Sequence, residues 1–113
     1  MSKALLIHEN GVVENIVYND YKDLQKLVGG YFEGIHIGEG FAYVDEEGKL
    51  KGKDVNPLAT KIWHDAARKH NYQINDFIVG KMVLTGKADD EGNDTDISQK
   101  TIDEIMNQGI VIV

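Results

Sequence analysis

Aromatic and small residues alternate along 40–45, and this period of two predicts a β-strand. Phe41 and Tyr43 lie on one face of that strand. The acidic residues 45–48 then predict a turn, because Gly48 is free to adopt a positive φ. The stretch 49–53 predicts a short returning strand at a sheet edge, where its lysines oppose pairing with another chain.

Five further segments predict the rest of a sheet. The runs at 3–7 and 12–18 are separated by Asn-Gly, the strongest short-range signal for a β-hairpin. Residues 31–38 alternate in the same way. The run 77–85 is apolar on both faces, so we expect the most buried strand there, in the middle of the sheet. The β-branched run 110–113 predicts a last short strand.

A helix is predicted to begin at Pro57, with Asn56 as its N-cap. From there the apolar residues follow helical spacing, and the other face is polar. The apolar stripe consists of Leu58, Ala59, Ile62, Trp63, Ala66 and Ala67.

Two shorter helices have similar boundary signals. Asp20 is the expected N-cap of a helix over 21–28, which Gly29 ends. Its expected inward-facing residues are Tyr21, Leu24, Leu27 and Val28. Near the C-terminus, Asp96 with Gln99 three residues later predicts a capping box at the start of a third helix.

The order of these elements predicts an α+β fold: one domain over 1–113, with a mixed, mostly antiparallel sheet and about three helices. The helices and strands do not alternate strictly, as they would in a doubly wound parallel sheet.

Composition narrows the class of protein. The chain has 113 residues, no cysteine and a net charge of -7. Its apolar runs are too short to span a membrane, and the N-terminus lacks a signal-peptide profile, so we expect a cytoplasmic protein. The acidic balance argues against direct nucleic-acid binding.

No motif in the sequence predicts a cofactor, a metal site or a catalytic centre. The acidic stretch around Gly92 fails the EF-hand pattern, because Lys87 stands at the first ligand position. The four histidines lack metal-ligand spacing, and the two serines suggest no Ser-His-Asp triad. We therefore expect a protein that is not an enzyme.

A candidate ligand site lies at the start of the helix that begins at Pro57. Free backbone N–H groups and the helix dipole favour an anion there. The residues predicted to bind it are Lys53, Asn56, Thr60, Lys61 and His64. In the alternative interpretation, Asn56 only caps its own helix.

The stretch 89–104 is strongly acidic, with seven carboxylates against one lysine. This predicts either a solvated loop or a surface that mimics the phosphates of DNA and binds a partner protein. The candidate partner-binding residues are Asp89, Asp90, Glu91 and Asp94.

Two segments, 44–63 (VDEEGKLKGKDVNPLATKIW) and 76–98 (DFIVGKMVLTGKADDEGNDTDIS), resemble a family of small bacterial and bacteriophage proteins, the 3846 family of domains of unknown function. The resemblance extends over 27–98, beginning at LVGGYFE. No motif of this family is tied to a reaction, so the resemblance implies a phage or mobile-element setting and not an activity.

Together these features predict a non-enzymatic binding protein that acts on host machinery or host defence. It would sequester a small anionic, nucleotide-like ligand or occlude a host protein. The alternatives are an acidic DNA-mimic inhibitor of a restriction or nucleic-acid enzyme, and a small enzyme acting on a nucleotide. The apolar run 110–113 also predicts self-association, most simply as a homodimer, unless it pairs within its own sheet.

Overall fold

Five antiparallel strands form one sheet in the computed structural model, which describes residues 1–113. The strand order across the sheet is β2-β1-β5-β4-β3. The strands are β1 (Ser2–Ile7), β2 (Val13–Tyr18), β3 (Phe32–Ile37), β4 (Gly40–Asp45) and β5 (Met82–Gly86). The central strand, β5, is buried along its whole length. The predicted α+β fold is therefore confirmed, with a sheet that is entirely antiparallel.

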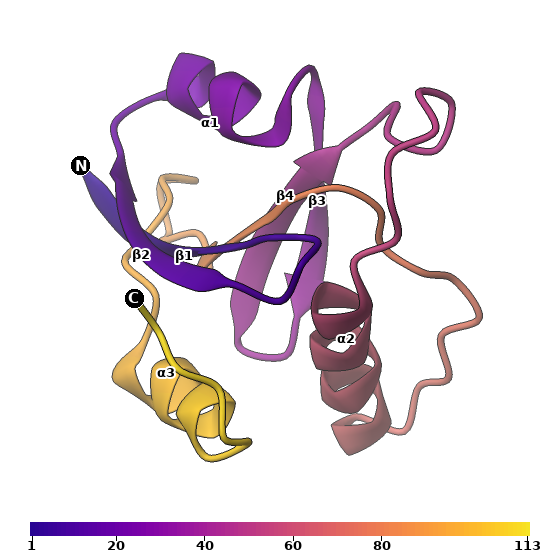
Figure 1. Ribbon diagram of the computed structural model, residues 1–113. Helices are drawn as coiled ribbons and strands as arrows, with labels where there is room; N and C mark the ends of the chain where they lie inside the picture. Colours follow the sequence, from indigo (N-terminus) through magenta and orange to yellow (C-terminus); the bar gives the residue numbers. More distant parts are fainter.

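Three helices cover the two faces of the sheet (Figure 1). Helix α1 (Tyr21–Val28) lies on one face, where Leu24 and Val28 pack with Leu6 and Val83. Helices α2 (Pro57–Lys69) and α3 (Gln99–Met106) cover the other face. The larger apolar core lies beneath them and includes Leu5, Ile7, Met82, Leu84, Ile62 and Ile105.

The local signals in the sequence place α1, α2 and the first hairpin correctly. Asn56 caps α2 by accepting a hydrogen bond from the N–H of Ala59 at 3.0 Å, and Pro57 begins the helix. Asp20 caps α1, and Gly29 ends it in the left-handed conformation. However, Tyr21 is 59% exposed, so the prediction that it faces inward is wrong.

Two strand predictions need correction. Residues 46–52 form turns, so the returning strand predicted at 49–53 is absent. The central strand begins at Met82 and not at Phe77, because Gly80 has a φ of 73° and the side chain of Lys53 lies against it. Only Val79 within 77–81 is paired, in an isolated bridge with Val55.

The predicted cap of α3 is also wrong. Ser98 caps the helix by accepting from the N–H of Thr101 at 3.2 Å. Asp96 instead accepts a hydrogen bond from the N–H of Lys3 at 2.9 Å, which fastens the segment before α3 to β1. Asp96 therefore takes part in a long-range hydrogen bond and does not cap the helix.

The C-terminal run 110–113 lies beside β2 without forming a regular strand. Ile112 makes a parallel bridge with Val13, and the N–H of Val113 donates to the Val13 carbonyl at 2.9 Å. Ile110 and Ile112 pack against the core, whereas Val111 is exposed. This is the internal pairing given above as the alternative to a dimer contact, and the homodimer stays a prediction.

Candidate functional site

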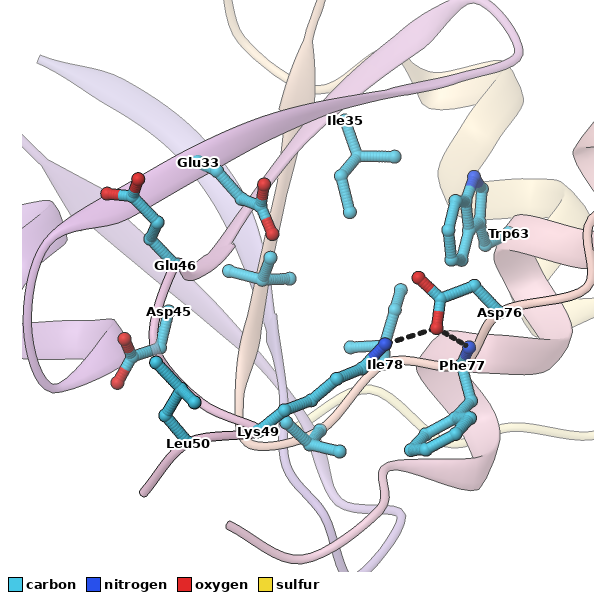
Figure 2. Close-up of a pocket in the computed structure, with 12 residues that line it drawn as sticks. Glu33, Ile35, Asp45, Glu46, Lys49, Leu50, Trp63, Asp76, Phe77 and Ile78 are labelled. Carbon is cyan, nitrogen blue, oxygen red and sulfur yellow. Dashed lines mark hydrogen bonds and ion pairs between the residues drawn. The ribbon is translucent and has the colours of Figure 1, made fainter. Parts of the chain in front are cut away.

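A pocket of about 270 Å³ opens at one end of the sheet, on the face covered by α2 (Figure 2). Two adjacent strands, the turn after β4, the first half of α2 and the segment before β5 surround it. The residues that carry its chemistry are Glu33, Ile35, Lys49, Trp63, Asp76 and Phe77.

The walls of the pocket are partly apolar and come from different elements. Glu33 and Ile35 are two apart on β3, so both side chains point to the face beneath α2. Trp63 belongs to the apolar stripe of α2, and Figure 2 shows its ring directed into the pocket opposite Glu33. Ile78 lies below, and Phe77, which is 45% exposed, forms the outer rim.

Hydrogen bonds to α2 hold the segment that carries Asp76 and Phe77. Thr60 Oγ1 accepts from the N–H of Ile78 at 2.9 Å. His64 Nε2 lies 2.6 Å from the Asp76 carbonyl oxygen, and because a carbonyl only accepts, this nitrogen carries a proton. The polar face of α2 therefore fixes one wall of the pocket.

Four acidic residues line the pocket, Glu33, Asp45, Glu46 and Asp76, and the last of them pairs with the one lysine that lines it. Lys49 forms an ion pair with Asp76, and its ammonium group lies 4.6 Å from the centre of the Phe77 ring. The hydrogen bond from Lys49, together with that from the N–H of Phe77, lowers the pKa of Asp76. Glu33 and Glu46 take part in no ion pair, and the Glu33 carboxylate points into the pocket (Figure 2).

A buried carboxylate fixes the turn that carries Lys49. Asp45 accepts hydrogen bonds from the ammonium groups of Lys51 at 2.8 Å and Lys53 at 2.7 Å, and from the N–H of Glu47. Burial alone raises the pKa of Asp45, but these three donors outweigh burial and lower it to about 2. These bonds therefore hold the turn after β4 against Asp45, the buried last residue of that strand.

The residues predicted to bind an anion at the start of α2 all form hydrogen bonds or ion pairs with other residues of this chain. Asn56 is completely buried, and its amide donates to the carbonyls of Ile7 and Gly80 at 3.0 and 2.8 Å. Lys53 donates to the Val28 carbonyl at 2.6 Å as well as to Asp45. These interactions join the start of α2 to β1, to the end of α1 and to the segment before β5. They occupy the Asn56 amide and the Lys53 ammonium group, which were expected to face a ligand.

The other three predicted ligand residues lie apart from one another. Thr60 and His64 support the segment before β5, as described above. Lys61 faces the opposite way, into a wide groove of about 810 Å³ between α2 and α3. Its ammonium group donates to Asp65 and to Gln108, at 2.6 and 3.0 Å.

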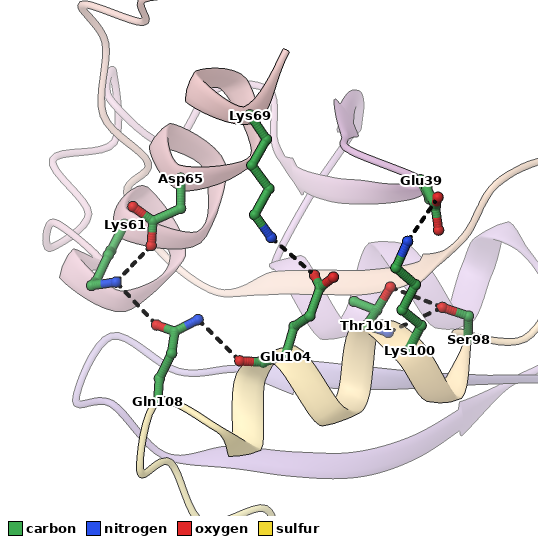
Figure 3. Close-up of polar contacts among 9 residues, drawn as sticks. All are labelled: Glu39, Lys61, Asp65, Lys69, Ser98, Lys100, Thr101, Glu104 and Gln108. Atoms are coloured by element: carbon green, nitrogen blue, oxygen red, sulfur yellow. Dashed lines mark hydrogen bonds and ion pairs between the residues drawn. The ribbon is translucent and has the colours of Figure 1, made fainter. Parts of the chain in front are cut away.

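The groove between α2 and α3 is lined mainly by polar residues that pair across it (Figure 3). Lys69 lies 3.5 Å from Glu104, and Lys100 lies 3.1 Å from Glu39. These exposed pairs are individually weak. They neutralise the cationic side chains of the groove, so the groove presents no concentrated charge to a ligand.

The predicted acidic partner-binding residues have different roles. Asp94 accepts hydrogen bonds from the hydroxyls of Tyr18 and Tyr43, at 2.5 and 2.6 Å. Burial and the bond to Asp94 raise the pKa of Tyr18 to about 12 and raise the pKa of Tyr43 as well. Asp89 caps its own turn by accepting from two backbone N–H groups. Only the side chains of Asp90 and Glu91 are exposed without such a role.

No group of three or more His, Asp or Glu side chains is arranged to hold a metal ion. No helix has the length and apolar character needed to cross a membrane.

The fold and the pocket define the chain as a small α+β domain with a partly apolar, carboxylate-lined cleft at one end of an antiparallel sheet. The chain belongs to the family described as Domain of unknown function (DUF3846), whose model matches residues 1–109. Comparison with curated proteins and with solved structures gives no match.

One feature of the sequence points to this pocket, although it belongs to no motif. Glu33 shares the period-two face of β3 with Ile35 and Ile37, so it is a charged residue on the apolar face of a strand. Asp76 and Lys49 give no such signal in the sequence, because only the fold brings the turn after β4 next to the segment before β5.

Proposed function

We propose that this domain is a non-enzymatic protein-binding module whose pocket receives a basic side chain of a partner protein. The observation that carries the proposal is the Glu33 carboxylate, which points into a partly apolar pocket and lacks a cationic partner. Glu33 is exposed, so a cationic side chain can reach its carboxylate from solvent.

The pocket's own lysine illustrates the chemistry that the site accepts. Lys49 reaches Asp76 while its ammonium lies over Phe77, which combines an ion pair with a cation–π contact. Trp63 and Glu33 present an aromatic ring and a carboxylate to each other from opposite walls of the pocket (Figure 2). Arginine suits the space between them best, because its planar group stacks on a ring and bonds a carboxylate in a bidentate manner.

Of the functions expected from the sequence, occlusion of a partner protein fits this pocket better than capture of a small anion. The residues that line it include four acidic residues and a single lysine, Lys49, which is already paired. The net charge of -7 would also steer a basic partner towards the domain. A host protein as the partner, a phage setting and a cytoplasmic location remain predictions from the sequence.

The single tryptophan of the chain, Trp63, lies in the pocket and gives a direct test. We expect N-acetyl-arginine amide to change its fluorescence in a saturable way, and N-acetyl-glutamine amide to leave it unchanged. Glu33→Gln should weaken the arginine response about tenfold, the effect of one charge-assisted bond. Glu91→Gln, the same change on the exposed acidic loop, should leave it intact. An equal response of the Glu33→Gln variant would contradict the proposal.

A further inference from the structure

The two outer strands of the sheet differ in how their free edges are covered. Strand β2 has the C-terminal run beside it, with Val113 hydrogen-bonded to Val13 and Asn15. Strand β3 is paired only with β4 and has nothing bonded to its outer edge. The edge of β3 is therefore the open side of the sheet.

The register of the β3–β4 pair shows which backbone groups face outward. The N–H of Glu46 donates to the Tyr31 carbonyl at 2.9 Å, just beyond the paired ends of these strands. Bonded positions alternate along an antiparallel pair, so Glu33, Ile35 and Ile37 point their backbone groups towards β4. The N–H and C=O groups of the residues between them, Phe32, Gly34 and His36, face outward.

Strand β3 has few of the features that usually protect a sheet edge. It contains no lysine and no proline, and its pairing with β4 is continuous, without a bulge. Its one protective feature is the inward-pointing charge of Glu33, which opposes an apolar or acidic strand and not a basic one. Gly34, at its middle, is exposed, and a glycine residue exposes mostly backbone. The lysines predicted for an edge strand at 49–53 lie instead in the turn after β4.

The pocket opens directly beneath this edge. Figure 2 shows β3 along the rim of the pocket, with Glu33 and Ile35 projecting from the strand into it. A strand added to β3 would place its side chains at alternate positions beside these two, because opposite residues of an antiparallel pair share one face.

We infer that an extended segment of a partner protein binds as a sixth, antiparallel strand along β3 and inserts a basic side chain into the pocket beside Glu33. This inference rests on the proposed function, and it adds the partner's conformation and its backbone contacts. Backbone bonds supply affinity in such strand addition, and the pocket beneath supplies specificity.

Charge favours a basic partner over a second copy of this chain. Each copy has a net charge of -7, and pairing two β3 strands would bring two Glu33 carboxylates to the same face without a cation between them. A segment with an arginine supplies the missing charge.

The probe is acetyl-Thr-Val-Thr-Arg-Thr-Val-Thr-amide, whose valines and arginine share one face when it is extended. With the arginine opposite Glu33, the threonine amides point towards β3, and the valine and arginine amides point away. N-methylation of the threonine amides should therefore weaken binding about tenfold or more, through lost hydrogen bonds. N-methylation of the valine and arginine amides should have little effect.

Amide hydrogen exchange supplies the second measurement. On binding of the unmodified probe, the amides of Phe32, Gly34 and His36 should become protected, while those of Glu33 and Ile35, already bonded to β4, serve as internal controls. Modified probes are used because a side chain at Gly34 would clash with the ring of Phe41, at 2.3 Å.

The outcomes separate the two proposals. If N-acetyl-arginine amide binds and the probe binds no more tightly, strand addition is wrong and the pocket proposal stands. If neither binds, both are wrong. Equal binding of the two methylated probes overturns strand addition. Protection of the three outward amides without any probe, growing with protein concentration, shows that a second copy occupies the edge and also overturns it.

Discussion

The hydroxyl of Tyr43 lies 2.6 Å from Oδ1 of Asp94, so the acidic loop is hydrogen-bonded to strand β4. The other carboxylate oxygen accepts from Tyr18 on β2, which β1 and β5 separate from β4 in the sheet. One carboxylate therefore joins two separated strands to the loop between β5 and α3. A residue predicted to bind a partner stabilises the fold.

We expect Asp94→Asn to lower the free energy of unfolding by about 2 kcal/mol, because two hydrogen bonds lose their charged acceptor. Urea denaturation measures this loss. Asp90→Asn removes a charge from the same loop without breaking a bond, and it should change stability by less than about 0.5 kcal/mol. Similar losses in the two variants would show that the tyrosine contacts contribute little.

The same contacts limit how the DNA-mimic alternative is tested. Neutralising all four candidate residues would also weaken the fold, because Asp94 and Asp89 bond to the protein itself. The informative change is the pair Asp90→Asn and Glu91→Gln, whose side chains are exposed. Full inhibitory activity in that double variant would argue against a phosphate-mimicking role for these two carboxylates.

Asp45 should make stability depend on pH in the acid range. Its pKa is lowered to about 2 in the folded protein, compared with about 3.9 for an unfolded aspartate. The folded state therefore binds the proton more weakly, so the stabilisation is complete above about pH 5 and is lost as the pH falls towards 2. The linked contribution to the free energy of unfolding is about 2–3 kcal/mol.

Urea denaturation at several pH values checks this expectation with Asp45→Asn. The variant should be less stable than the wild type at pH 7, and the difference should narrow as the pH falls from about 5 to about 2. Asp54→Asn, at an exposed aspartate in the same turn region, is the matched control and should follow the wild-type curve. A gap that stays constant over this range would mean that Asp45 does not titrate as described.

We expect Asn56 to contribute more to the free energy of unfolding than a helix cap does. A cap alone costs about 1 kcal/mol when replaced by alanine. Here the buried amide also bonds the carbonyls of Ile7 and Gly80, so Asn56→Ala should cost at least about 3 kcal/mol. Asn56→Asp separates the two roles, because aspartate caps as well as asparagine but cannot donate to carbonyls. A mild effect of the aspartate would assign the role of Asn56 to capping alone.

The sequence predicted those features whose causes are local. Asn56 and Pro57 determine the start of α2 within a few residues, as Asp20 and Gly29 determine both ends of α1. The prediction of the α3 cap was wrong because Lys3, far away in the sequence, donates a hydrogen bond to Asp96. Ser98 caps the helix instead. The central strand is shorter than its apolar pattern because Gly80 turns the chain beside Lys53.

The candidate site was less predictable for the same reason. Its charges come from Glu33 on a strand, Lys49 in a turn and Asp76 after a helix, and only the fold brings them together. The predicted anion site relied on the start of α2 being open to solvent. Asn56 is instead enclosed by β1 and the segment before β5, a long-range arrangement that its capping signal does not reveal.

The C-terminal run should contribute to stability through β2. Deleting residues 110–113 removes the two backbone bonds that Val113 makes to Val13 and Asn15, and it uncovers the core beside Ile112. We expect the deletion to cost about 2–4 kcal/mol, from lost hydrogen bonds and apolar burial. Val111→Ser, at a position that is 76% exposed, is the control and should cost little. Light scattering on the same samples tests self-association: a dimeric wild type and a monomeric, equally stable deletion would assign the run to an interface between copies and contradict its role in the sheet.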